Sequence, residues 1–188
     1  MLVRDERTGD YEMKFKLIAV TAALGLALSG CSVPPLNFTP AAVPESPKRQ
    51  NAALVSTTVT VASPEEAVGK LNTAGVEADV ASLWESTLED SLLRMAIFQD
   101  NSPNKLSLVV KVLEMDLRGL GSSARTTASY EFLDRNTGDV VYDTTITTNE
   151  GASDYVGVSR VRKSANRSIQ ANIEEFLRQI AEAEIDFP

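Results

Sequence analysis

Alternation of apolar and polar side chains predicts β-strands in four parts of the chain. The predicted strands cover residues 51–62, 105–118, 124–133 and 140–148. In the first of them, Val55, Thr57, Val59 and Val61 share one face, which we expect to be buried. In the last two, Ala128, Tyr130 and Phe132 and then Val140, Tyr142, Thr144 and Ile146 form the expected apolar faces.

Two features refine this strand pattern. The apolar positions of residues 105–118 change phase after Val112, from Leu106, Leu108 and Val110 to Leu113, Met115 and Leu117. Because the side-chain period of a strand is two, this change predicts a β-bulge, or alternatively a strand buried on both faces. Residues 134–139 then predict a hairpin loop in which Gly138 supplies a positive φ angle.

Apolar residues spaced by three and four predict two long helices, at residues 79–98 and 157–185. Asp79 is the expected N-cap of the first helix, and Trp84 is expected in the core or, alternatively, in the wall of a ligand pocket. Residues 63–78 predict a loop that contains at most one short turn, with the capping-box spacing at Ser63 and Glu66. The second helix has its basic residues in its first half, against the helix dipole, so we expect packing to hold it.

Together these elements predict an α+β domain of two layers. We expect a mostly antiparallel sheet of about four strands, because the last three follow one another through short connections. Both long helices are expected to pack on one face of this sheet.

The N-terminal part has the pattern of an export signal. Lys14 and Lys16 precede an apolar stretch, residues 17–28, that is shorter than the roughly 20 residues needed to span a bilayer. Leu28, Ser29 and Gly30 then lead to Cys31. Residues 1–12 contain several acids, which are unusual in such a signal, so we expect translation to start at Met13.

Residues 28–31 resemble the lipobox of bacterial lipoproteins. That resemblance implies cleavage before Cys31 and attachment of acyl chains, such as palmitate, to this cysteine. An ordinary secretory signal or a short buried helix is the alternative. Ser32 follows the cysteine in place of the Asp that retains lipoproteins in the inner membrane, which implies the outer membrane, facing the periplasm.

The expected organisation therefore has three parts. Residues 1–30 form the signal peptide, residues 31–50 form a lipidated, Pro-rich tether, and residues 51–185 form the single domain. A docking peptide for a partner groove is the alternative for the Pro-rich part.

Composition excludes several kinds of chemistry. The chain has no histidine and one cysteine, Cys31, so Ser-His and Cys-His catalytic pairs and histidine metal sites are absent from it. We expect no cofactor, no metal site and no catalytic residue. The formal net charge of −8 argues against nucleic acid and against electrostatic binding to anionic lipid headgroups.

One local charge pattern contrasts with this acidic total. Arg160, Arg162, Lys163 and Arg167 form a basic run at the start of the second long helix. It is the candidate partner-binding site, for an acidic protein or for lipid headgroups, and an ordinary solvated helix face is the alternative. A second cluster, Glu85, Glu89 and Asp90, is the only support for a carboxylate-dependent hydrolase, and it too suits a solvated helix face.

Five segments resemble the YajG-like family of bacterial lipoproteins and, more loosely, the auxiliary lipoproteins of envelope ABC transport systems. They are residues 28–31, 83–98, 105–120, 128–146 and 164–180. The resemblance covers about residues 83–180 and rests on element order and alternation. It implies a periplasm-facing α+β domain without known enzyme activity, and it transfers no catalytic residue.

The expected function is therefore binding. We expect a membrane-anchored, non-enzymatic accessory factor in envelope assembly or transport, with an unidentified envelope protein as partner. The alternatives are a module that binds a small ligand or lipid between helices and sheet, and the hydrolase named above.

Overall fold

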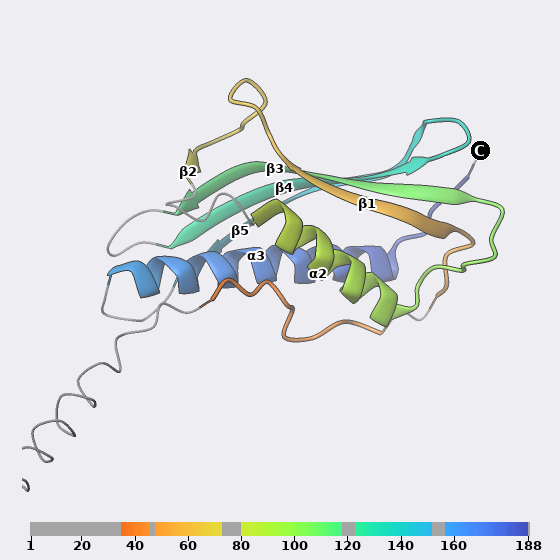
Figure 1. Ribbon diagram of the computed structural model, residues 1–188. Coiled ribbons are helices and arrows are strands. Elements are labelled where there is room, and N and C mark those ends of the chain that lie inside the picture. Colours follow the sequence, from red (N-terminus) through yellow and green to blue (C-terminus); the bar gives the residue numbers. More distant parts are fainter. Residues whose placement is uncertain (1–34, 46–47, 73–79, 118–122, 152–156, 188) are drawn as a thin grey trace, which may run out of the picture. The chain divides into compact units, whose positions relative to one another are not determined.

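The structure, a computed structural model, describes residues 35–45, 48–72, 80–117, 123–151 and 157–187. It has the predicted α+β architecture, in which one mixed sheet carries both long helices on the same face (Figure 1). The strands are β1 (Ala53–Val61), β2 (Leu71–Asn72), β3 (Lys105–Leu117), β4 (Ala124–Asp134) and β5 (Val140–Glu150). The helices are α2 (Val80–Met95) and α3 (Gly157–Glu182). Among the described residues, no helix combines the length and the apolar character needed to cross a membrane.

Strand β3 is central and has the predicted bulge. The order of the sheet is β1-β3-β4-β5, and β3 runs antiparallel to β4. The register between them shifts at Val112 and Glu114, so Leu113 is the extra residue. Val110 and Val112 before the shift and Met115 after it are therefore all buried on the helix-covered face. The phase change in the sequence thus predicted the bulge correctly.

Strand β1 lies at one edge and pairs in parallel with β3. The register shifts between Leu54 and Ser56, which leaves Val55 as an extra residue that is 52% exposed. Thr57 and Val59 are buried as expected, but Val61 is 44% exposed. The predicted buried face was therefore wrong for Val55 and Val61, and for Val55 the cause is this second bulge.

Strands β4 and β5 form the predicted hairpin. Gly138 has a φ of 82° in its loop, and Gly138 N–H donates to the carbonyl of Asp134. A register shift between Phe132 and Leu133 on β4 pairs them with Tyr142 and Val140, so Val141 is extra. Val140 is consequently 51% exposed and does not belong to the buried face that was predicted for it.

Both helices are shorter than predicted. Helix α2 ends at Met95 because Ala96 has a φ of 49° and turns the chain away, so residues 96–98 are not helical. The expected N-cap, Asp79, lies outside the described residues. Helix α3 ends at Glu182, and Ile185 N–H donates instead to the side chain of Gln50.

The core fills the space between the helices and the sheet. Trp84 of α2 is fully buried, as the core interpretation predicted. Tyr130 of β4 stacks on Phe176 of α3, with ring centroids 4.2 Å apart. The predicted stripe of α3 is buried from Ala165 to Ile180.

The Pro-rich segment differs from a free tether. Phe38 is fully buried and meets Trp84 edge-on, with ring centroids 6.4 Å apart. The amide of Ala41 donates to the Glu174 carboxylate over 2.7 Å. The packed domain therefore begins well before residue 51, because an aromatic side chain within the Pro-rich stretch completes the core.

Residues 63–78 were predicted as a loop, and the described part contains a short strand as well. Leu71 of β2 pairs in parallel with Met115 of β3. Ser63 N–H donates to the Glu66 carboxylate over 3.1 Å, which is one half of the expected capping box. A two-residue strand carries too little alternation to be recognised in the sequence.

Candidate functional site

A groove opens between the start of β1 and the end of α2. Its volume is about 630 Å³. It exists because α2 stops at Met95 and the chain then turns to follow β1, where Gln99 N–H donates to the carbonyl of Ala52. The lining residues are Arg49, Leu54, Val55, Ser56, Thr57, Glu89, Leu92, Leu93, Ala96, Phe98, Gln99, Asp100 and Asn101.

The groove exposes apolar surface to solvent. Leu93 is 79% exposed and Val55 is 52% exposed, while Leu54 and Phe98 are half-buried. Leu92 is buried and packs into the core below. Charged side chains of Arg49, Glu89 and Asp100 also line the groove, so this apolar patch has polar neighbours. An apolar centre with polar neighbours is typical of a recognition surface.

The strand beside the groove is protected against pairing with another strand. The Glu85 carboxylate accepts a hydrogen bond from Val59 N–H over 3.0 Å and so occupies a donor on β1. The bulge at Val55 interrupts the regular edge. Bulges and charged side chains are the devices that prevent edge-to-edge association. The groove therefore suits recognition through side chains better than addition of a strand.

The sequence did not point to this groove. Val55 was assigned to the buried face, and Leu93 was outside the predicted apolar stripe of its helix. The position of Leu93 beside Leu92 and off the stripe was the one available signal, because it places a large apolar side chain on the solvent face of an amphipathic helix.

The predicted basic run lies at the first half of α3. Arg167 is exposed and donates to the carbonyl of Gly151 over 2.9 Å, whereas Arg160, Arg162 and Lys163 are half-buried. The Nε atom of Arg160 is buried and has no hydrogen-bond partner among the described residues. The run is therefore one end of a helix face, and it is separate from the groove because it sits at the opposite end of the sheet (Figure 1).

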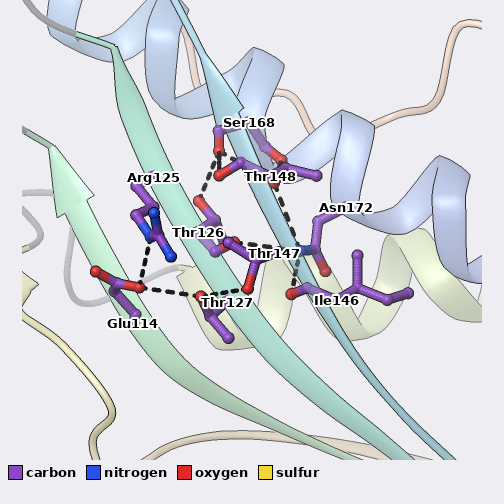
Figure 2. Close-up of polar contacts among 9 residues, drawn as sticks. All are labelled: Glu114, Arg125, Thr126, Thr127, Ile146, Thr147, Thr148, Ser168 and Asn172. Carbon is purple, nitrogen blue, oxygen red and sulfur yellow. Dashed lines mark hydrogen bonds and ion pairs between the residues drawn. The ribbon is translucent and has the colours of Figure 1, made fainter.

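A polar network connects β4, β5 and α3 near that basic run (Figure 2). Ser168 donates to Thr126 over 2.9 Å, and Asn172 Nδ2 donates to the carbonyl of Ile146 over 2.9 Å. Thr148 donates to the carbonyl of Ser168 over 2.7 Å. These groups are largely satisfied by one another, so the network fixes α3 on the sheet and is not a site with free donors.

A second polar group lies on the sheet face that the helices leave uncovered. The Glu114 carboxylate accepts from Arg125 Nε and from the Thr127 hydroxyl, each over 3.0 Å (Figure 2). The Thr127 and Thr147 hydroxyls are also 3.0 Å apart. This group links β3, β4 and β5 and so stabilises pairing across the sheet.

The predicted carboxylates do not converge. Glu85 accepts the bond from β1, while Glu89 and Asp90 are exposed. Within the described ranges, no group of three or more acidic, cysteine or histidine residues is arranged to hold a metal ion. Cys31, the predicted lipid attachment site, lies outside the described residues.

No protein-family model matches the sequence, and no curated relative was found. The chain is similar in structure to a DUF330-family protein from Xanthomonas campestris, with 12% identity over 79% of this chain and 92% of that chain and a TM-score of 0.49. It is similar to a minor lipoprotein from Acinetobacter baumannii, with 15% identity, coverage of 67% and 91%, and a TM-score of 0.41. It is also similar to PelC from Paraburkholderia phytofirmans, whose structure is a dodecamer, with 17% identity, coverage of 70% and 91%, and a TM-score of 0.42. At these identities, no residue role is carried over to this chain.

Proposed function

We propose that this chain is a lipid-anchored, non-enzymatic protein of the bacterial envelope that binds another envelope protein through the groove between β1 and α2. The anchor is the lipid on Cys31, and Ser32 supports a place at the outer membrane, facing the periplasm. In this proposal the chain itself is an accessory factor in envelope assembly or transport.

The exposure of Leu93 carries the proposal. A leucine that is 79% exposed, beside a groove with a half-buried Leu54 and Phe98, is surface that a partner would remove from water. A few well-packed residues near the centre of an interface supply most of the binding free energy in protein complexes. Because the edge of β1 is protected, we expect the partner to insert side chains into the groove.

The experiment is crosslinking in intact cells. A photoreactive amino acid at Leu93 is expected to give one defined protein adduct, to be identified by mass spectrometry. The same amino acid at Thr145, which is exposed on β5, serves as the control position and is expected to give none. Adducts of equal yield at both positions, or none at Leu93, would contradict the groove as the binding site.

A matched pair of variants tests the same point by affinity. Leu93→Ser is expected to weaken capture of the crosslinked partner by at least about 30-fold, the effect of losing an interface hot spot. Val68→Ser changes an equally apolar and 66% exposed side chain that does not line the groove, and it is expected to leave capture unchanged. Equal loss in both variants would indicate a general effect on the surface.

A small apolar ligand is the second candidate, and the size of the groove favours it. A volume of about 630 Å³ lies within the range of about 300–1,000 Å³ that holds small molecules. Mass spectrometry of the natively purified protein distinguishes the two, because a bound lipid or metabolite would add a discrete mass that Leu93→Ser reduces.

A further inference from the structure

The first residues that the structure describes, 35–37, lie against the basic half of α3. The carbonyl of Pro35 accepts a hydrogen bond from Asn166 Nδ2 over 3.1 Å, and Asn37 N–H donates to Asn166 Oδ1 over 3.2 Å. Gln170 Nε2 donates to the carbonyl of Asn37 over 2.9 Å. Two side chains of one helix face therefore hold the chain where it enters the domain.

Asn166 lies within the basic run. Lys163 is three residues before it, Arg162 is four residues before it, and Arg167 follows it directly. Residues three and four apart are neighbours on a helix surface. The chain therefore reaches the domain at its basic helix face, although the protein as a whole has a formal net charge of −8.

The distance to the predicted lipid is short. Cys31 precedes Pro35 by four residues, and an extended chain spans at most about 3.6 Å per residue, so the backbone links the two over about 14 Å at most. With the acyl chains of Cys31 in a bilayer, this reach keeps Pro35 and Asn166 near the headgroups. A free tether of 20 residues would have allowed the domain to stand much farther away.

We propose that the first half of α3 is a membrane-contacting surface, in which Arg162, Lys163 and Arg167 bind anionic phospholipid headgroups while the lipid on Cys31 anchors the chain. The inference rests on that anchor, which is part of the proposed function, and not on the groove. A basic patch beside a lipid anchor is the combination that strengthens membrane attachment, because acyl chains and charge act together. The overall acidic charge does not prevent this contact. At physiological salt the Debye length is about 8 Å, so repulsion between the headgroups and acidic residues farther away than this is largely screened.

The surface also sets an orientation. The hairpin loop between β4 and β5 lies at the far end of the sheet from the start of α3 (Figure 1). The strands of that hairpin have 11 residues each, which corresponds to about 35 Å at the usual rise per residue. With the first half of α3 on the headgroups, the hairpin and the groove lie at the end of the sheet that is farther from the membrane, where the groove is open to a partner.

The experiment uses the lipidated full chain in vesicles that carry a quencher on the lipid headgroup. If Cys31 is acylated, a second cysteine can be labelled alone, because the chain has no other. A fluorophore on Thr39→Cys, whose amide donates to the side chain of Asn37, the residue that contacts Asn166, is expected to be quenched in vesicles with phosphatidylglycerol and much less in zwitterionic vesicles. A fluorophore on Asn136→Cys, in the hairpin loop, is expected to stay unquenched in both.

Charge removal identifies the residues. The double variant Lys163→Gln, Arg167→Gln is expected to lower the equilibrium constant for docking of α3 on the headgroups about fivefold for each basic side chain removed. Lys105→Gln with Arg135→Gln removes the same charge at the other end of the sheet and is expected to have no effect. Raising the salt concentration from about 0.1 M to about 1 M, where the Debye length falls from about 10 Å to about 3 Å, is expected to abolish the quenching.

The outcomes separate the possibilities. Equal quenching in anionic and zwitterionic vesicles, or quenching that the α3 variant leaves unchanged, would overturn the headgroup contact. Loss of quenching of the Thr39 label on addition of inorganic phosphate, but not of chloride at the same ionic strength, would indicate a site for free anions. That result would overturn the assignment of α3 as a membrane-contacting surface. Protein that does not float with vesicles, and whose Cys31 peptide carries no lipid mass, would contradict the anchor and with it the proposed function. Floating protein with an unquenched Thr39 label contradicts only this inference.

Discussion

The hydroxyl of Tyr130 on β4 donates a hydrogen bond to Asn172 Oδ1 on α3 over 2.8 Å, and both residues are fully buried. Asn172 in turn donates to the carbonyl of Ile146 on β5. One polar chain therefore connects two strands and the long helix through an otherwise apolar core. A buried polar group without a partner is costly, so this arrangement selects one position of α3 along the sheet.

Removing the hydroxyl of Tyr130 is expected to destabilise the fold. Tyr130→Phe leaves Asn172 Oδ1 buried without a donor and should lower the free energy of unfolding by about 1–3 kcal/mol, as measured by urea denaturation. Tyr142→Phe, at a half-buried residue of β5, is the control and should cost less. A double-mutant cycle with Asn172→Ala should show coupling above about 0.5 kcal/mol, and strict additivity would argue against the contact.

Alkaline pH is expected to unfold the protein through the same tyrosine. Burial raises the pKa of Tyr130 well above its usual value, an effect only partly opposed by the nearby Trp84 indole. The unfolded chain therefore loses this proton first, so stability is constant below about pH 10 and falls above it by about 1.4 kcal/mol per pH unit. Burial and the charges of Asp143 and Glu175 also raise the pKa of Tyr142, which acts in the same direction.

Urea unfolding at several alkaline pH values, followed together with tyrosine absorbance, measures this effect. The ionisation of Tyr130 should coincide with unfolding in the unmodified protein. Tyr130→Phe should reduce the slope of stability against pH. A slope that the substitution leaves unchanged would mean that Tyr130 is not the responsible group.

Truncation of Phe38 is expected to cost as much as loss of a central core residue. Phe38→Ala removes a fully buried ring that packs against Trp84 and should lower the free energy of unfolding by about 3–5 kcal/mol. It should also make residues 39–50 sensitive to protease at low concentration. Thr39→Ala, at the exposed neighbour, is the control. Unchanged stability of Phe38→Ala would restore the interpretation of this segment as a free tether.

Gly138→Ala is expected to destabilise the hairpin for a backbone reason alone. An added Cβ would meet no atom within 4 Å, but the φ of 82° is unfavourable for any residue with a side chain. The cost should be about 1–2 kcal/mol. Gly151→Ala is the matched control, because Gly151 lacks a positive φ and an added Cβ would lie 4.0 Å from Ser123 Cβ. Thermal denaturation of both variants measures the difference, and equal midpoints would contradict the explanation.

Much of the fold was predictable from the sequence because the relevant signals are local. The alternation through Ala128, Tyr130 and Phe132, the stripe of α3 and the turn at Gly138 each depend on neighbouring residues only. Even the bulge at Leu113 was visible, since a change of phase within one strand needs no partner to be recognised. The basic run of α3 was likewise evident, but its surroundings were not.

Only the tertiary structure decided the contacts between distant parts of the chain. The bulge at Val55 left no phase change that could be read, because Thr57 and Val59 continue the same alternation, and it appears only in the register with β3. The groove depends on where α2 stops relative to β1. The contacts of Pro35 with Asn166 and of Phe38 with Trp84 join residues far apart in the sequence, which no local pattern encodes. The sequence by itself determined the four long strands and the two long helices, and where the chain resembles a lipoprotein. Packing decided which surfaces those elements leave exposed, because the burial of a side chain is set by its neighbours in space and not by its neighbours in sequence.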